Sequence, residues 1–150
     1  MSRISTLGRF FVSMSLVAGS FALAPKMHAQ QGDIKVNVPF AFSADNQKFD
    51  AGLYEIRELN PFVLLVSNTT THQSRLLLVS DMGMRDIQSY GRLVFHRYNG
   101  DKRYLYQVWM PGRSEFSELR PTQQERKTML AAKLASSSGT VMEALAVPAR

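Results

Sequence analysis

The chain of 150 residues contains no cysteine. This absence excludes disulfide bonds, zinc sites built from thiolates, cysteine nucleophiles and a lipid anchor attached to a cysteine. The folded chain must therefore take its stability from a hydrophobic core.

Histidine is also scarce, and the common catalytic motifs are missing. The chain has three histidines, and only His72 and His96 follow the N-terminal segment. Metal sites usually cluster histidines and carboxylates at short spacings, and neither HExxH nor HxH occurs. The patterns GxSxG, GxGxxG and the P-loop are missing as well. We therefore predict no metal site and no cofactor, and we assign no catalytic residue.

The first 29 residues have the three regions of a secretory signal peptide. Two arginines and no acid precede an apolar run at residues 10–24, and the small Ala29 precedes Gln30. The run has 15 residues, fewer than the roughly 20 that span a bilayer as a helix. We predict cleavage between Ala29 and Gln30, with a cut after Ala24 as the alternative, and hence a periplasmic or extracellular protein.

The remaining residues, 30–150, have a modest positive charge. Three of the 18 Lys and Arg residues and none of the 12 acids lie in the first 29 residues, which leaves 15 cations against 12 acids and a net charge of +3. This charge gives no reason to expect a nucleic-acid partner. No second apolar run of 18 residues follows, so we expect no membrane span after signal removal and one domain over residues 30–150.

Alternating apolar residues predict that this domain is mainly β. Strand patterns cover residues 33–42, 48–59, 62–67 and 75–80, and residues 81–91 read as a loop. We expect an antiparallel sheet, arranged as a small sandwich or an open barrel.

One helix is predicted near the C-terminus, at residues 121–135. Pro121 suits a first helical turn, and Thr122 with Glu125 matches a capping box. Residues 140–147 alternate again and predict a last strand, with a loose tail as the alternative.

The stretch GRLVFHRYNGDKRYLYQVWMPG, residues 91–112, predicts a β-hairpin that turns at Asn99 and Gly100. A two-residue loop pairs Arg97 with Lys102, which are like charges. A four-residue loop pairs Arg97 with Tyr104, and we favour it. In either register the apolar face holds Leu93, Phe95, Arg97, Tyr104, Tyr106 and Val108. The mixed face holds Val94, His96, Tyr98, Arg103, Leu105, Gln107 and Trp109.

Four hairpin residues are candidate binding groups: His96, Tyr98, Arg103 and Trp109. Aromatic rings interleaved with cations can stack on sugars or anchor a partner, and His96 beside Tyr98 could act as a general base. Aromatic residues also favour strands for structural reasons alone. Which face of the hairpin is buried decides whether Trp109 can touch a ligand.

The ordered set of motifs resembles a group of small uncharacterised secreted proteins of soil bacteria. The set comprises VPFxF at residues 38–42, AGxYxI at residues 51–56, LVFHRY at residues 93–98 and VW at residues 108–109. Glu118-Leu119 and Glu125-Arg126 complete it. The resemblance implies export and a β-rich fold, and it assigns no catalytic residue.

Three functions remain open. The first is a non-enzymatic binding or structural protein of the cell envelope or the medium, whose partner is an envelope protein or glycan. The second is a carbohydrate-binding module that uses the hairpin aromatics. The third is a hydrolase that uses His96 or dispersed carboxylates, such as those at residues 55, 58, 115 and 118.

Overall fold

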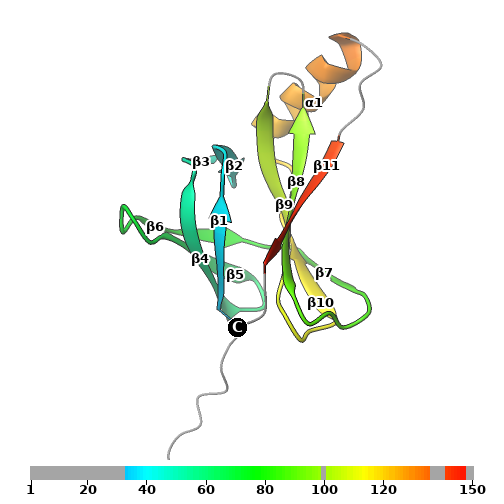
Figure 1. Ribbon diagram of the computed structural model, residues 1–150. Helices are drawn as coiled ribbons and strands as arrows, with labels where there is room; N and C mark the ends of the chain where they lie inside the picture. Colours follow the sequence, from blue (N-terminus) through cyan, green and yellow to red (C-terminus); the bar gives the residue numbers. More distant parts are fainter. Residues whose placement is uncertain (1–32, 99–100, 136–140, 148–150) are drawn as a thin grey trace, which may run out of the picture.

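The chain is mainly β, with two antiparallel-dominated sheets and one helix near the C-terminus (Figure 1). The computed structural model describes residues 33–98, 101–135 and 141–147. The predicted fold class is confirmed in its sandwich form, with the helix at one end of the sheets.

The first sheet has four strands in the order β1-β4-β5-β6, all antiparallel. Its strands are β1 (Ile34–Val38), β4 (Gly52–Asn60), β5 (Val63–Asn68) and β6 (Ser74–Leu78). Buried and exposed residues alternate along β1, as its sequence pattern predicts.

The second sheet has seven strands, and its main path runs β11-β8-β9-β10-β7. Its strands are β2 (Phe42–Ala44), β3 (Gln47–Phe49), β7 (Asp81–Met84), β8 (Gly91–Tyr98), β9 (Lys102–Trp109), β10 (Glu115–Glu118) and β11 (Val141–Val147). The hairpin of β2 and β3 joins this sheet through one parallel pair, between Ser43 and Tyr104.

Two predicted strands, at residues 33–42 and 48–59, are divided between the sheets. The second contributes to β3 in one sheet and to β4 in the other. The pattern at residues 33–42 is interrupted after Val38, where Pro39 has no N–H for a ladder, and it resumes as β2 in the other sheet. A tight turn with positive φ at Asp45 and Asn46 joins β2 to β3. The predicted loop at residues 81–91 is wrong in its first part, because residues 81–84 form β7 against β10.

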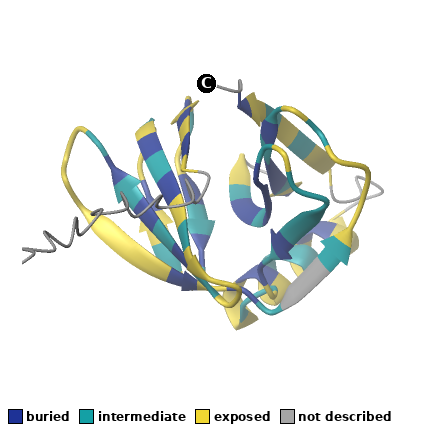
Figure 2. Ribbon diagram, turned by 90° about the horizontal axis from the view of Figure 1, so that it is seen from below, coloured by how far each residue is buried: buried dark blue, intermediate teal, exposed yellow. Residues whose placement is uncertain are grey.

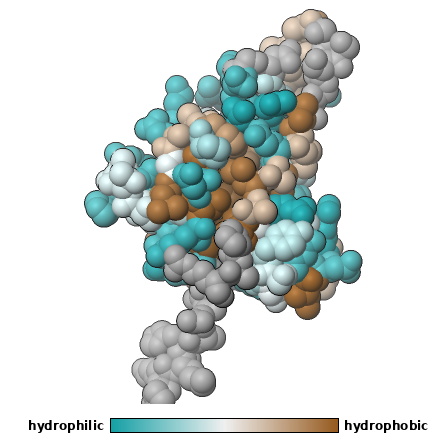
Figure 3. Space-filling view, viewed as in Figure 1, coloured by the Kyte–Doolittle hydropathy of each residue, from teal (hydrophilic) through white to brown (hydrophobic). Residues whose placement is uncertain are grey.

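The core lies between the two sheets and is closed by aromatic rings. Phe42 and Phe49 stack with centroids 4.8 Å apart, and Phe42 also meets Tyr54 of β4 and Phe95 of β8 edge to face. The small β2–β3 hairpin therefore links the two sheets through this core. Burial in the core raises the pKa of Tyr54. Figure 2 shows the buried faces turned toward each other, and Figure 3 shows hydrophobic atoms between the sheets on the side of β1 and β11.

The hairpin register differs from both predicted loops. Tyr98 pairs with Lys102 and Arg97 with Arg103, so three residues separate the strands, and Asp101 takes a positive φ of 59°. The facing guanidinium groups are tolerated because Arg103 has an acid of its own: its Nε lies 2.8 Å from Glu143 of β11.

This register also changes the predicted faces. One residue of slip turns a strand over, so Leu105, paired with Phe95, joins the core face, and Tyr104, paired with His96, leaves it. The register shift between Val94 and Phe95 then restores the predicted pairing beyond Tyr106. Both faces of the hairpin are buried, since Tyr98, Tyr104 and Trp109 on the other face are buried too.

The C-terminal elements lie at one edge and one end of the second sheet. Helix α1 (Gln123–Ala135) lies within the predicted segment 121–135, and β11 (Val141–Val147) pairs with β8 along its whole length. Over the residues placed by the structure, no helix combines the length and apolar character needed to cross a membrane.

Candidate functional site

The outer face of the β8–β9 hairpin carries two groups of side chains that combine aromatic and ionisable residues. We call the first the carboxylate cluster, made of His96, Tyr98, Tyr106 and Glu125. We call the second the tryptophan cluster, made of Arg85, Arg92, Trp109 and Phe116. They contain three of the four predicted binding residues.

The carboxylate cluster is centred on Glu125, of which only 5% is exposed. One of its oxygens, Oε1, lies 2.9 Å from Nδ1 of His96 and accepts a hydrogen bond of 3.1 Å from the Tyr98 hydroxyl. A buried carboxylate needs such partners to offset the loss of hydration.

The start of helix α1 brings Glu125 to this position. The N–H of Glu125 donates to Oγ1 of Thr122 at 3.2 Å, which is one half of the predicted capping box. The Glu125 carboxylate turns toward the sheet and binds His96 and Tyr98. In the first turn of the helix its negative charge is also favoured by the helix dipole.

Aromatic and helical side chains enclose this cluster. The Tyr106 ring stacks on His96 with centroids 4.1 Å apart. On the next turns of the helix, the Thr128 hydroxyl forms a hydrogen bond of 3.1 Å with the Tyr104 hydroxyl. Ala132 packs against the rings of Tyr98 and Tyr104. These contacts attach the inner face of α1 to the hairpin.

The chemistry of the carboxylate cluster favours a structural role. A His–carboxylate pair can orient a general base, but catalysis also needs a substrate within reach of the imidazole. The side chains of His96 and Glu125 are only 15% and 6% exposed. We conclude that the pair joins the helix to the sheet.

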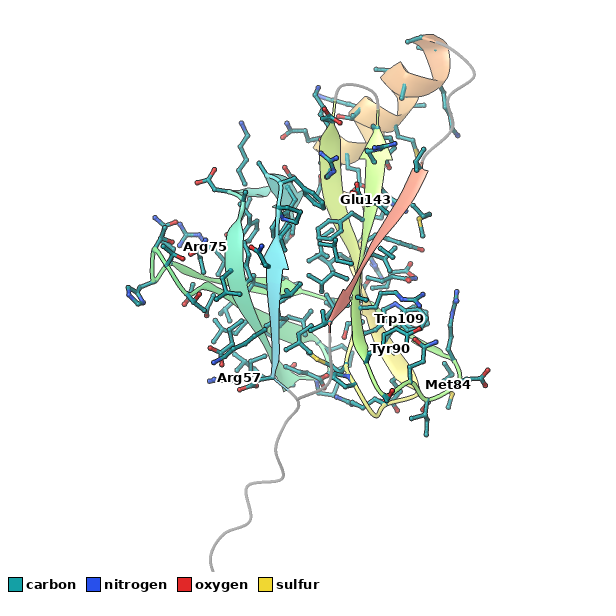
Figure 4. The ribbon with its side chains drawn as sticks, viewed as in Figure 1. Arg57, Arg75, Met84, Tyr90, Trp109 and Glu143 are labelled. Atoms are coloured by element: carbon teal, nitrogen blue, oxygen red, sulfur yellow. The ribbon has the colours of Figure 1, made fainter. Side chains whose placement is uncertain are left out.

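The tryptophan cluster covers the indole ring of Trp109, of which 7% is exposed. Phe116 of β10 stacks on it at 5.1 Å, and the guanidinium groups of Arg85 and Arg92 lie 4.9 and 5.2 Å from its centroid. Its Nε1 donates to Gln107 at 3.2 Å. Figure 4 shows Trp109 next to Tyr90, at the end of the second sheet away from α1. These protein groups occupy the positions that a stacked sugar would need.

The four predicted binding residues do not share one site. His96 and Tyr98 meet at Glu125. Trp109 pairs instead with Arg92, which precedes His96 by four residues on β8. Four residues of strand correspond to roughly 13 Å. Arg103 lies on the opposite face, where its guanidinium covers Phe40 at 4.2 Å.

Three of the four dispersed carboxylates are held in ion pairs, and the fourth, Glu118, accepts a hydrogen bond of 2.9 Å from Gln107. Arg113 joins Glu58 of β4 to Glu115 of β10, at 2.6 and 3.0 Å, and so connects the two sheets. Arg57 holds Glu55 at 3.2 Å and also Asp33, whose hydrogen bond raises the pKa of the guanidinium. In the described ranges of the chain, no group of three His, Asp or Glu residues could hold a metal ion.

Two important residues were missed by the sequence reasoning. The sequence predicts Glu125 only as a capping residue. Its burial could not be predicted, because the adjacent residues in the sequence are polar or charged. Phe116 alternates with Glu115 and Ser117, a strand signal that was available in the segment leading out of the hairpin.

We predict that Glu125→Ala lowers the free energy of unfolding by about 1–3 kcal/mol, because it leaves the His96 and Tyr98 groups without their acceptor. Glu125→Gln retains an acceptor oxygen and should cost less. The measurement is urea unfolding followed by circular dichroism. Gln124→Ala, an exposed change in the same turn, is the matched control, and equal stability of the two alanine variants would contradict the role of Glu125.

We also predict that Trp109 has blue-shifted emission and is weakly quenched by acrylamide. Gly83→Ala should shift the emission to the red and increase quenching, because a Cβ at this position would clash with Phe116, the ring that covers Trp109. Met84→Ala changes the exposed neighbour and should leave the spectrum unaltered. Strong quenching in the unsubstituted protein would show that the indole is open to solvent.

No protein-family model, curated protein or solved structure matches the chain. The assignment of a function therefore rests on the geometry and chemistry of this molecule.

Proposed function

We propose that this chain is an exported, non-enzymatic binding protein that accepts an extended segment of a partner protein as an added strand on β6. The observation that carries the proposal is the open, leucine-rich edge of this strand. The export part rests on the charge and apolar pattern of the first 29 residues.

The backbone of β6 presents hydrogen-bonding groups outward. Val79 donates its N–H to the Phe62 carbonyl, and Asn68 donates to the Gln73 carbonyl, so the odd-numbered residues face β5. Bonding directions alternate along an antiparallel strand, and the N–H and C=O groups of residues 74, 76 and 78 therefore face the free edge. Among the strands that the structure places, β6 ends its sheet and has β5 as its one neighbour.

The side chains of the same strand support binding through apolar contact. Leu76 and Leu78 are 54% and 66% exposed, and they pair with the half-buried Leu65 and Val63 of β5. Nearby, Phe62 in the β4–β5 turn is 63% exposed. Figure 2 shows this side of the first sheet exposed along β6.

Edge strands usually carry devices that prevent pairing, such as prolines and lysines. The sequence of β6, SRLLL, has one charge, at Arg75, and no proline. Addition of a partner strand would satisfy the outward backbone groups and cover both leucines, each worth about 1.5–3 kcal/mol when fully buried.

The other two functions have less support from the geometry. Sugar stacking would have to displace Phe116 and the arginines from Trp109. Hydrolysis would have to use an enclosed His96 or carboxylates that already bind arginines or, at Glu118, Gln107.

The export part predicts that cells release a chain that begins at Gln30. Leu16→Arg should keep the full-length chain in the cytoplasm, because a charge in the apolar run costs about 2.5–3.5 kcal/mol on insertion. Leu16→Ala is the control and should be processed. The measurement is cell fractionation with intact-mass analysis, and a full-length chain found only in the cytoplasm would disprove export.

The binding part predicts that Leu76→Pro abolishes partner association while the domain stays folded. Proline removes an N–H that faces the free edge, and prolines are tolerated on edge strands. Association is measured in cells as the yield of adducts from a photo-crosslinking amino acid placed at Leu78, with identification of the captured peptide by mass spectrometry.

Leu76→Thr is the matched control, because it removes the same side chain but keeps the backbone N–H. Its adduct yield should exceed that of Leu76→Pro at least about tenfold, the factor for roughly 1.4 kcal/mol of lost hydrogen bonding. A photo-crosslinker at the exposed Ile87 tests for non-specific capture. Equal yields for the proline and threonine variants, or adducts only between two copies of this chain, would contradict the proposal.

A further inference from the structure

The charges of the described chain are unevenly distributed. We define the helical end as residues 97–98, 101–103, 120–135 and 141–143, which comprise the tip of the β8–β9 hairpin, α1 with its approach, and the start of β11. It contains seven Lys or Arg residues and three acids, a net charge of +4. The rest of the described chain has seven Lys or Arg residues against nine acids, a net charge of −2. The modest overall charge therefore conceals a strongly basic end.

Two of the three acids of the helical end are held by protein groups, and the third, Asp101, has a side chain that is 83% exposed. Glu125 is buried and bonded to His96 and Tyr98. Glu143 and Asp101 lie 2.8 and 3.7 Å from Arg103. Six of the seven cations are exposed, namely Arg97, Lys102, Arg120, Arg126, Lys127 and Lys133. Six exposed cations therefore face solvent beside one exposed acid, and the charge that this end presents is mainly positive.

The outward face of α1 combines this charge with exposed leucines. Its inward residues contact the hairpin through Glu125, Thr128 and Ala132. Residues spaced by four share a helix face, and Leu130 and Leu134 follow Arg126 at this spacing. These two leucines are 56% and 88% exposed. Figure 1 shows α1 at the far end of the second sheet, well separated from β6.

We propose that the helical end docks on the surface of an anionic lipid bilayer. Arg126, Lys127 and their exposed neighbours would contact lipid phosphates, while Leu130 and Leu134 would enter the boundary between headgroups and acyl chains. Amphipathic helices that lie in a membrane interface combine apolar residues with Lys and Arg in this way. A nucleic acid would match the cations but would leave both leucines in water, so the lipid surface is the better complement. The proposal is independent of export and of β6.

The test compares binding of the purified chain to vesicles of phosphatidylcholine and to vesicles with about one third phosphatidylglycerol. Co-flotation is the readout, at low and at high salt. We expect binding to the anionic vesicles that falls as salt rises. The apolar residues 10–24, where present, contribute equally to every variant, so differences between variants report the helical end.

A charge-matched pair of variants locates the effect. Lys127→Gln with Lys133→Gln removes two cations from the helical end, whereas Lys35→Gln with Lys48→Gln removes two from exposed positions elsewhere. We expect the first pair to lower the partition coefficient about tenfold and the second pair less than about twofold. Equal losses in both pairs would overturn the proposal.

A third variant separates insertion from simple charge attraction. Leu130→Ser with Leu134→Ser retains every charge, and both sites are exposed, so circular dichroism should show an intact fold. We expect this variant to lose most of its binding to anionic vesicles. Undiminished binding, or full displacement of the unsubstituted chain from vesicles by a short DNA duplex at matched phosphate, would overturn the proposal in favour of general polyanion attraction.

Discussion

Burial of the β8–β9 hairpin on both faces is the constraint on which the rest of the molecule depends. On one face Phe95, which is fully buried, meets Phe40 and Phe42. On the other face Tyr98 and Tyr104 receive helix α1. The three-residue loop and the register shift near Tyr106 set both faces together, so the sandwich and the attachment of the helix follow from one pairing.

This arrangement uses the reactive side chains for architecture. Buried polar and charged groups need partners, and the hairpin supplies them: His96 and Tyr98 serve Glu125, and Gln107 accepts from the Trp109 indole. A stretch rich in aromatic and cationic residues is therefore a poor guide to a ligand site when both of its faces are covered. The two surfaces proposed for binding, the free edge of β6 and the outer face of α1, therefore lie outside the hairpin.

The sequence predicts the local features of this fold well and its pairings poorly. Alternation identifies most strands, and Pro121 with Thr122 places the start of the helix, because these signals depend on neighbours along the chain. The hairpin register was wrong by one residue because it depended on a like-charge penalty that Glu143 of β11 removes. The burial of Glu125 likewise depends on a strand nearly thirty residues away, which no local pattern reports.

The two proposed surfaces depend on different physics, and their separation in the fold allows both to act together. Strand addition at β6 relies on directional backbone hydrogen bonds and apolar contact, which salt affects little. Contact of α1 with anionic lipid relies on charge and weakens as salt screens it. Because β6 and α1 lie at distant parts of the molecule, a partner strand on β6 would not compete with a membrane for α1. Such a chain could hold an extended partner close to a bilayer. A rise in salt concentration would then release the chain from the membrane while the partner stays bound to β6.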